Sequence, residues 1–562
     1  MADGGGAGGG MTFEGRSIAF REGWTVAAAL IAAGERGMRE TADGGLRSVF
    51  CGMGVCQDCL VEIDGAPNQR ACLAKARPGL AVRRQAARAR LDAAPPLAAR
   101  PARVLRPELL VIGGGAGGLS AAVAAASAGA EVVVLDERAM PGGQYYKQAA
   151  ADAPLDAQQA DGAALIARAR AAGATVLSGV ELWGAFDGPV FAATEPQGAL
   201  VIRPRAVVIA TGVYERPAIV RGWEAPGVMT TGAAQTLWRS HRALPGARVL
   251  VAGNGPLNAQ VALELARGGA QVAALAEAAP PPRARPAAAL RLAAADPTLA
   301  AKGARLLAGL AARGVPLRWG ARLARVEAVG GALRATLTDG ARFDVDAVLT
   351  NEGFQPSNEA LRLLGCAMAW DARFSHLRVT RDADMQTSVA GVFAVGDCCG
   401  LGGAPAAEAE GAIAGAAAAR AVGRAAPDPA AARRALKRAR AFQSALWALY
   451  AAAPRDPAAM EPETLVCRCE GVRARDLDAA LATPAEEGGP ADIGAVKRAT
   501  RLGMGRCQGR YCGPPLAELM AARRGEAPGD LSFFAPRAPI KPVRIADVLA
   551  AEAVIEALRD DG

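Results

Sequence analysis

The stretch from Glu108 to Asp136, ELLVIGGGAGGLSAAVAAASAGAEVVVLD, decides the fold of this chain. It predicts an apolar strand, a glycine turn, an alanine-rich helix and a second apolar strand that ends in an acid. Gly113 permits the tight turn, Gly115 lets a pyrophosphate approach the backbone, and Gly118 lets helix and strand touch. The helix then offers unpaired N–H groups to phosphates, and Asp136 can accept hydrogen bonds from a ribose diol. The stretch therefore predicts a dinucleotide-binding βαβ unit in an α/β protein.

A membrane helix is the alternative interpretation of this stretch. Residues 109–130 carry no charge, and about 20 apolar residues are enough to cross a bilayer. The same residues include six glycines and are rich in alanine rather than leucine, which argues against a membrane span. We therefore expect no membrane span in this chain.

Length, charge and cysteine content limit the functional classes. A chain of 562 residues predicts about three to five domains. The net charge of +9 comes from scattered arginines rather than from basic clusters with interleaved aromatics, so we expect no nucleic-acid partner. Residues 1–10, MADGGGAGGG, are predicted to be a disordered tail without a secretory signal. Eleven cysteines in unequal clusters indicate metal ligation in a reducing compartment, so we expect a cytoplasmic protein.

The first cysteine cluster lies in a compact unit predicted over residues 11–90. Cys51, Cys56 and Cys59 are spaced as C-x4-C-x2-C and are followed by Cys72, which is the plant-type pattern for a [2Fe-2S] cluster. Short strand-like runs around one helix near residues 26–33 predict a β-grasp ferredoxin fold. A structural zinc site is the alternative, although it usually needs paired CxxC-like knuckles. The Pro- and Ala-rich residues 91–107 are predicted to be a linker.

Two later segments complete the FAD site that the glycine turn begins. A Gly-Gly-Gln turn follows Asp136, and an apolar strand ending in Ala-Thr-Gly resembles the segment by which two-dinucleotide-domain flavoproteins return to their FAD domain. The matching end of that domain is a strand ending in Gly-Asp. We therefore predict a Rossmann-like FAD-binding domain in two parts, residues 108–224 and 348–424. Its predicted FAD-binding residues outside the first βαβ unit are Gly143, Gln144, Ala210, Thr211, Gly212, Gly396 and Asp397.

A second βαβ unit is predicted within residues 225–347. It begins with Gly253 and Gly255, but Asn258 replaces the third glycine. The residue equivalent to Asp136, counted from the first glycine, is Ala276, and an acid, Glu277, comes only one step later. Both departures weaken ribose and phosphate recognition. The unit could bind NAD(P) or another nucleotide, or it could be kept only for architecture.

A second metal motif follows a helical connector predicted over residues 425–460. Cys467 and Cys469, then Cys507 and Cys512, predict another [2Fe-2S] cluster in a small helical module over residues 461–525. The tail, residues 526–562, is expected to pack across another surface. The adjacent cysteines 398 and 399 follow the Gly-Asp of the FAD domain and are expected to be small side chains beside the cofactor rather than a redox dithiol.

Five runs of sequence carry a resemblance to a known family. They are ATGVYERP (210–217), APGVMTTGAAQTL (225–237), NEGFQPSNE (351–359), CRCEGV (467–472) and VKRATRLGMGRCQGRYC (496–512). These runs are similar to the flavoprotein subunits of hydrogen cyanide synthase, opine oxidase and D-hydroxyproline dehydrogenase, and to the α subunit of heterotetrameric sarcosine oxidase. The likeness covers nearly the whole chain, with a small ferredoxin subunit fused in front. The last module resembles bacterioferritin-associated ferredoxin, so we call it BFD-like.

The resemblance implies an FAD-dependent enzyme acting on CH–NH donors, which passes electrons from flavin to the clusters and on to an acceptor. The implied substrate is an amino acid or secondary amine of the opine, hydroxyproline, proline, sarcosine or glycine type. In many relatives a separate FAD-containing, D-amino-acid-oxidase-like subunit oxidises the amine. Tyr145, Tyr214 and Arg216 are candidate catalytic residues near the flavin. Two alternatives stay open: an NAD(P)H-dependent FAD/iron–sulfur reductase, and an electron-relay or assembly subunit whose partner performs the chemistry.

Overall fold

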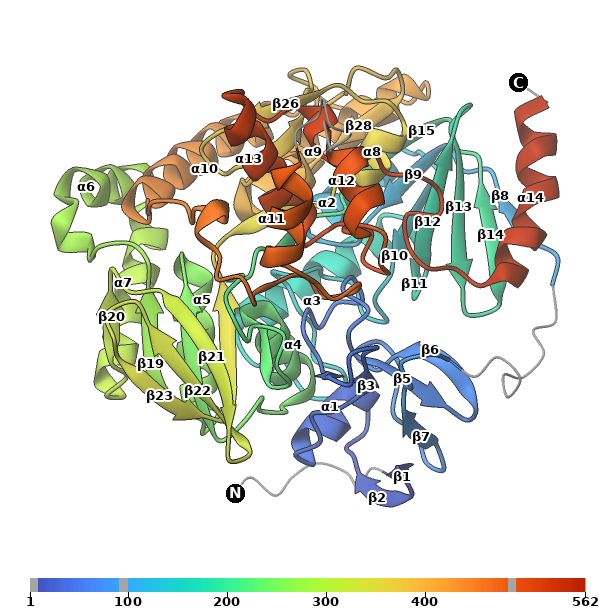
Figure 1. Ribbon diagram of the computed structural model, residues 1–562. Helices are drawn as coiled ribbons and strands as arrows, with labels where there is room; N and C mark the ends of the chain where they lie inside the picture. Colours follow the sequence, from blue (N-terminus) through green and yellow to red (C-terminus); the bar gives the residue numbers. More distant parts are fainter. Residues whose placement is uncertain (1–8, 90–99, 484–491, 561–562) are drawn as a thin grey trace.

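The computed structural model describes residues 9–89, 100–483 and 492–560. The amino-terminal unit lies at the bottom of Figure 1 in blue, the two dinucleotide-binding sheets form the body, and the orange and red carboxy-terminal module lies across the front. Residues 109–130, which raised the membrane alternative, form strand β9, the glycine turn and helix α2. Among the described helices, none is both long and apolar enough to cross a membrane.

The amino-terminal unit is a five-stranded sheet that holds one helix, which confirms the predicted β-grasp fold. Helix α1 (Val26–Ala32) begins after Thr25, whose side chain accepts a hydrogen bond from the backbone N–H of Ala28. Gly10 already belongs to the first strand, so the predicted tail is shorter than residues 1–10, and residues 1–8 lie outside the described part. The sheet order is β2-β1-β7-β5-β6, and the strands of this unit are β1 (Gly10–Phe13), β2 (Arg16–Ala19), β3 (Arg39–Glu40), β4 (Leu46–Arg47), β5 (Leu60–Ile63), β6 (Ala66–Arg70) and β7 (Ala81–Arg84).

The first dinucleotide-binding sheet is fully parallel, with the order β11-β10-β9-β15-β28. Four of its strands, all except the edge strand β11, are buried, as their unbroken apolar runs predict. Helices α2 and α9 are rich in alanine and glycine and pack closely on each other. The elements are β9 (Leu109–Ile112), α2 (Ala116–Ser127), β10 (Val132–Asp136), α3 (Ala157–Ala171), β11 (Thr175–Ser178), β15 (Ala206–Ile209), β28 (Val392–Ala394) and α9 (Gly403–Ala421).

The second parallel sheet has the order β17-β24-β18-β19-β20. Strand β24 (Ala347–Asn351) pairs with β18, so this sheet extends past the predicted boundary at residue 347. The other elements are β17 (Val228–Thr230), α4 (Thr231–His241), β18 (Arg248–Gly253), α5 (Pro256–Arg267), β19 (Gln271–Glu277), α6 (Pro286–Ala295), α7 (Pro297–Ala312) and β20 (Leu317–Trp319). An antiparallel meander, β21 (Leu323–Val329), β22 (Ala332–Leu337) and β23 (Arg342–Val345), follows it.

A four-stranded sheet beside the FAD domain draws in two segments from far along the chain. Strand β8 (Arg103–Leu105), inside the predicted linker, pairs parallel with β14, while residues 90–99 lie outside the described part. Helix α14 (Ile545–Asp560) of the tail covers the same sheet, at the right of Figure 1. The other strands are β12 (Glu181–Phe186), β13 (Val190–Glu195) and β14 (Gly198–Ile202). The tail therefore packs across a surface as expected.

The remaining elements join the FAD domain to the BFD-like module. They are β16 (Val213–Glu215), β25 (Phe354–Pro356), α8 (Glu359–Leu363), β26 (Met368–Asp371), β27 (His376–Val379), α10 (Ala430–Leu449), β29 (Leu465–Cys467), β30 (Val472–Arg473), α11 (Ala474–Ala482), α12 (Ile493–Thr500) and α13 (Gly513–Arg524). Strands β16 and β25 pair antiparallel and connect the two dinucleotide-binding sheets. Helix α10 lies against α9 and α6, so the predicted connector contacts a helix of each dinucleotide-binding domain.

Candidate functional site

The first glycine turn has the geometry that a bound pyrophosphate needs. Gly113 has φ +110°, a backbone conformation that favours glycine. A Cβ atom on Gly118 would lie 1.8 Å from the carbonyl oxygen of Gly113, so only glycine lets α2 approach β9 this closely. Gly115 precedes the first turn of α2 and offers no side chain to cap it. The N–H groups of that turn are therefore available to phosphate oxygens.

Asp136 ends β10 beside this turn. Its carboxylate accepts hydrogen bonds from the backbone N–H of Gly114 at 2.9 Å and of Arg138 at 2.8 Å. Burial raises the pKa of Asp136 to about 6. The side chain lines the cavity at the turn, so it both holds the turn in shape and presents an acceptor to a ribose.

The opposite end of the site comes from the last segment of the FAD domain. Asp397 accepts hydrogen bonds from the backbone N–H of Gly402 and Gly403, both at 2.9 Å. Burial raises the pKa of the Asp397 carboxyl. Helix α9 begins at Gly403, so its amino end points into the same region. The Thr211 hydroxyl donates to the carbonyl oxygen of Ser357 and fixes the strand end that carries Ala210 to Gly212.

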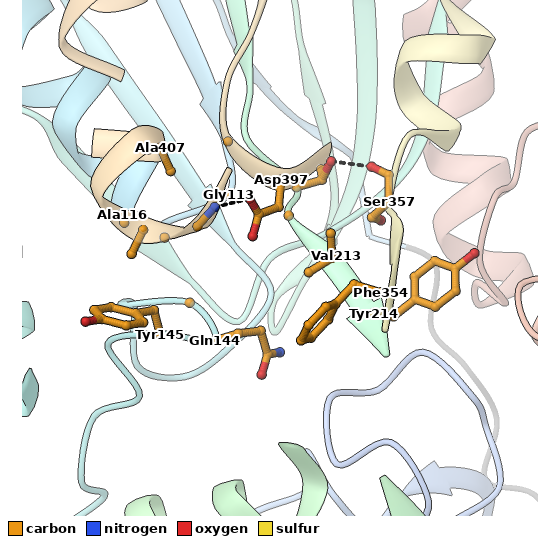
Figure 2. A pocket seen from close by; sticks show the side chains of 18 of the residues that line it. Gly113, Ala116, Gln144, Tyr145, Val213, Tyr214, Phe354, Ser357, Asp397 and Ala407 are labelled. Atoms are coloured by element: carbon orange, nitrogen blue, oxygen red, sulfur yellow. Dashed lines mark hydrogen bonds between the residues drawn. The ribbon is translucent and has the colours of Figure 1, made fainter. Parts of the chain in front are cut away.

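These segments line one continuous cavity. Figure 2 shows Gly113 and Ala116 of the first turn near Asp397 and Ala407 of the last segment, with Gln144 and Tyr145 below them. The cavity continues to the second glycine turn and reaches the ferredoxin loop at Met53. Ten of the predicted FAD-binding residues line it: Gly113, Gly115, Asp136, Gly143, Gln144, Ala210, Thr211, Gly212, Gly396 and Asp397. Because this cavity joins a phosphate-binding turn to a second helix amino end, it fits FAD.

The three candidate catalytic residues have different positions. Tyr145 is 36% exposed and lines the cavity. Tyr214 also lines the cavity but is buried, and its ring centroid lies 5.6 Å from that of Tyr511 in the BFD-like module. Arg216 lies outside the cavity lining, where it pairs with Glu518 of α13 at 2.8 Å. Arg216 thus links the flavoprotein part of the chain to the BFD-like module, and a catalytic role for it stays a prediction.

A buried polar group in the cavity was not predicted. The Lys147 ammonium donates to Gln235 Oε1 at 2.8 Å, and Glu215 accepts from the backbone N–H of Gly232. Lys147, Glu215 and Gln235 all line the cavity. Burial lowers the pKa of Lys147 to about 7 and raises the pKa of Glu215. The sequence offered only one signal, a charged residue two positions after Tyr145, and burial of that charge depends on packing between distant segments.

The second glycine turn departs from the sequence-based expectation in its acid. Strand β19 has a bulge between Val272 and Ala274, which inserts one residue and brings Glu277 opposite Gly253. Glu277 accepts from the backbone N–H of Gly255 at 2.9 Å. Glu277, and not Ala276, is therefore the counterpart of Asp136.

Two further contacts at this turn bear on nucleotide binding. Asn258, buried in α5, donates to the carbonyl oxygen of Asn351 at 2.9 Å and accepts from the Thr231 hydroxyl at 2.7 Å. It therefore ties α5 to β24 and α4. The indole of Trp447 from α10 lies against Gly255, where a Cβ atom would be 3.3 Å from it. Gly255 and Trp447 both line the cavity, so the indole borders the surface that a pyrophosphate would approach.

The first cysteine set forms two contacting pairs in the ferredoxin unit. Cys51 contacts Cys56, and Cys59 contacts Cys72. Burial disfavours the thiolate, but contact with Cys56 and the backbone N–H of Met53 lower the pKa of Cys51 to about 7. Across the described residues, no three His, Cys, Asp or Glu side chains gather as ligands of one metal ion. Two pairs suit a [2Fe-2S] cluster, in which each iron takes two thiolates, better than a zinc site.

The second cysteine set lines one small cavity. Cys467 contacts Cys469 and Cys512, and Cys469 also contacts Cys507. Contact with Cys467 holds the pKa of Cys469 well below its usual range. Four cysteines around one small cavity, three of them buried, fit the thiolate ligands of a second [2Fe-2S] cluster.

Cys398 and Cys399 lie buried beside Asp397 with their sulfurs 3.7 Å apart. Cys398 is free and points to backbone carbonyls of Ile209 and Val395. The pair is thus a set of small side chains packed next to the FAD domain core.

Three family models match successive parts of the chain. A family model described as pyridine nucleotide-disulphide oxidoreductase matches residues 107–420. A 2Fe-2S iron-sulfur cluster binding domain matches residues 10–87, and a BFD-like [2Fe-2S] binding domain matches residues 465–522. These matches support FAD and two [2Fe-2S] clusters as the cofactors.

Individual relatives extend this result. An opine oxidase subunit of Agrobacterium tumefaciens (strain Ach5) is 33% identical over 477 residues, which cover 78% of this chain and 91% of the relative. Hydrogen cyanide synthase subunit HcnA of Pseudomonas aeruginosa is 45% identical over 69 residues, covering 12% of this chain and 66% of that subunit. The crystal structure of L-proline dehydrogenase from P. horikoshii has the same fold, with a TM-score of 0.73, 19% identity, and coverage of 97% of this chain and 98% of that chain. The chain therefore belongs to the pyridine nucleotide-disulphide oxidoreductase family, as an FAD-binding iron–sulfur oxidoreductase related to this opine oxidase subunit.

Proposed function

We propose that this chain serves the oxidation of a C–N bond in an amino acid or secondary amine, and passes the electrons from flavin to its two clusters. One observation supports this proposal most. Met53 and Val55 of the first cluster loop line the FAD cavity, and Cys56 of the same loop lines the cavity of the second cysteine set. The loop of the first cysteine set thus borders both the FAD cavity and the cavity of the second cysteine set.

The residues around the cavity have separable tasks in this proposal. FAD supplies two-electron chemistry with a donor and one-electron chemistry with iron–sulfur clusters. The α2 turn and Asp136 hold the nucleotide end, and Asp397 with the amino end of α9 orients the flavin end. Lys147, with its pKa near 7, can hold or accept a proton at Nζ within the cavity.

We infer that the donor belongs to the opine, hydroxyproline, proline, sarcosine or glycine type, because the opine oxidase relative is similar over 91% of its length. We also infer that the oxidation of the C–N bond itself takes place on a separate, FAD-containing amine-oxidising subunit, since the relatives are themselves subunits of larger enzymes. An electron acceptor completes the reaction. The cysteine pattern supports a cytoplasmic location, which stays a prediction.

The NAD(P)H-dependent alternative is less well supported by the geometry. A nicotinamide dinucleotide would have to place its pyrophosphate at Gly255, where the Trp447 indole lies. Asn254 is also bonded there, to the carbonyl oxygen of Tyr450 at 2.9 Å. In this proposal, the second βαβ unit therefore has a structural role and does not bind NAD(P)H.

Anaerobic mixing tests the proposal directly. The purified protein is mixed with NADH, with a panel of proline, hydroxyproline, sarcosine and opine compounds, and with the same panel plus an amine-oxidising partner subunit, while the flavin absorbance is followed. We expect bleaching with an amine, alone or with the partner. Rapid stoichiometric bleaching by NADH, and none with any amine, would support the reductase alternative and refute the proposal.

A further inference from the structure

Two cluster-binding loops that lie far apart in the sequence meet in this structure. Cys56 of the ferredoxin loop lines the same small cavity as the four cysteines of the second set. Asp58, two residues later, and Arg468, between two cysteines of the second set, line it as well. Each loop thus contributes one charged residue to the boundary between the cysteine sets.

Arg468 is held at this boundary from several sides. Its Nε donates to Asp58 Oδ2 at 2.7 Å, and its Nη1 donates to the carbonyl oxygen of Trp223 at 2.7 Å. Its guanidinium lies 3.9 Å from the centre of the Phe50 ring and 4.7 Å from that of Trp223. The side chains of Arg468 and Asp58 are only 4% and 1% exposed. The ion pair between Arg468 and Asp58 is therefore held in one geometry and shielded from solvent.

The boundary carries more positive than negative charge. Arg39 also pairs with Asp58, at 3.0 Å. Arg47 lies close enough to interact electrostatically with both Asp58 and Arg468. All three arginines are buried. When Glu224, Arg506 and Glu470, which interact with these groups, are included, four cations face three carboxylates. A buried excess charge is costly unless an opposite charge lies nearby. A cluster held by four thiolates provides such a negative charge on each side.

We propose that Arg39, Arg47, Arg468 and Asp58 form a charged bridge that holds the two [2Fe-2S] clusters against each other and favours their reduced, more negative forms. Arg468 is its central positioning residue. Each cluster takes up one electron, as one Fe(III) becomes Fe(II), so the joined pair stores both electrons of one two-electron oxidation. The inference rests on the two clusters and not on the identity of the donor.

The test uses the full-length holoprotein, with dithionite as reductant and redox dyes as mediators. In the wild type, we expect the electron paramagnetic resonance spectrum of the fully reduced protein to show magnetic interaction between the clusters. In Arg468→Gln, we expect that interaction to weaken, and the equilibrium of each cluster with the dye to shift about tenfold toward oxidised cluster, which corresponds to about 59 mV for one electron. Iron and FAD content should be unchanged.

Two further variants make the result decisive. Arg475→Gln removes an exposed arginine of the same module, which pairs with the exposed acids Glu463 and Asp476, and should shift neither cluster. Asp58→Asn removes negative charge from the bridge and should shift the equilibria the opposite way, even if Arg468→Gln loses iron. Non-interacting clusters in the wild type, or equal shifts in Arg468→Gln and Arg475→Gln, would overturn the proposal. Since no amine is used, its failure is distinct from failure of the proposed function.

Discussion

Tyr511 lies near both cysteine sets and beside Tyr214 of the flavin cavity. Its ring makes edge contact with Phe50 at 5.4 Å and lies 5.6 Å from Tyr214, which lines the flavin cavity. Its pKa is raised by burial and by the nearby cysteines 51, 56 and 507. Within the described residues its hydroxyl has no hydrogen-bond partner. A buried hydroxyl seldom stays unpaired, so we expect it to donate to a cluster sulfur.

The Tyr511→Phe variant tests this hydrogen bond. Hydrogen bonds to sulfur help to set cluster potentials, and removing one of about 1 kcal/mol should lower the potential of one cluster by about 40 mV. Iron and FAD content should stay the same. A potential titration followed by electron paramagnetic resonance measures the shift. Tyr450→Phe, a buried tyrosine near Glu277, is the control. Equal potentials in the two variants would show that the hydroxyl does not reach a cluster.

Single residues also show how far sequence predicts this site. Motif glycines, Asp136, Asp397 and the eight cysteines could be named because turns, strand ends and ligand spacing impose them locally. Lys147 and Glu215 could not, because their role depends on burial between segments 88 and 17 residues away. The ion pair of Arg216 could not be predicted for the same reason, because its partner Glu518 is 302 residues distant.

At the scale of elements, the second βαβ unit departs from the glycine motif at two positions, and its structure makes up for both in ways that motif spacing does not predict. The bulge in β19 accommodates one extra residue. Glu277 therefore occupies the position that counting from the first glycine assigned to Ala276. Asn258 does not merely widen the gap between helix and strand, because its side chain bonds across that gap. Bulges and buried amide contacts depend on tertiary pairing, and a single sequence does not reveal them.

The variant Asn258→Gly restores the third glycine of the motif, and we expect it to weaken the protein. It removes two buried hydrogen bonds and places glycine in a helix, which should cost about 2 to 4 kcal/mol. Ala266→Gly in the same helix removes no such bond and should cost about 1 kcal/mol. Thermal unfolding compares the two. A variant as stable as wild type, or one that gains tight NADH binding, would contradict the assigned role.

Helix α14 links the tail to the flavin cavity. Ala551 is fully buried on the four-stranded sheet near Trp183 and Val190. The segment just before the helix brings Ile540 and Lys541 into the cavity lining, where Lys541 pairs with Glu137 and Glu181. The tail thus forms part of the wall of the flavin cavity.

Detaching α14 should therefore loosen FAD. Ala551→Glu buries a carboxylate, which costs several kcal/mol and should release the helix. We expect at least tenfold faster proteolysis within residues 526–562 and faster FAD loss. Leu549→Glu, at a position that is 59% exposed on the same helix, should behave as wild type. Protected tails in both variants would indicate that α14 docks by another surface.

At the scale of the whole molecule, the chain order of the modules differs from their spatial order. The ferredoxin unit and the BFD-like module are separated by the whole flavoprotein, yet Asp58 and Arg468, 410 residues apart, are bonded. Sequence motifs predicted the modules and their cofactors because each module has its own local pattern. Their contact could not be predicted, since it depends on how three separate cores pack together.

This spatial order predicts different outcomes for two cysteines of the same cluster. Cys72 lies in a hydrophobic core shared by the ferredoxin unit and the second sheet, away from the second set, whereas Cys56 lines the cavity of that set. We expect four irons per wild-type chain. Cys72→Ser should retain two irons, FAD and a normal second cluster, while Cys56→Ser should also perturb the second cluster.

Iron analysis, flavin absorbance and paramagnetic resonance of the remaining cluster measure these outcomes. Cys512→Ser is the matched variant of the second set and should retain the first cluster and FAD. Loss of FAD from both Cys72→Ser and Cys512→Ser would mean that the cofactor sites do not form independently. An unperturbed second cluster in Cys56→Ser would mean that the two sets are not in electronic contact through this loop.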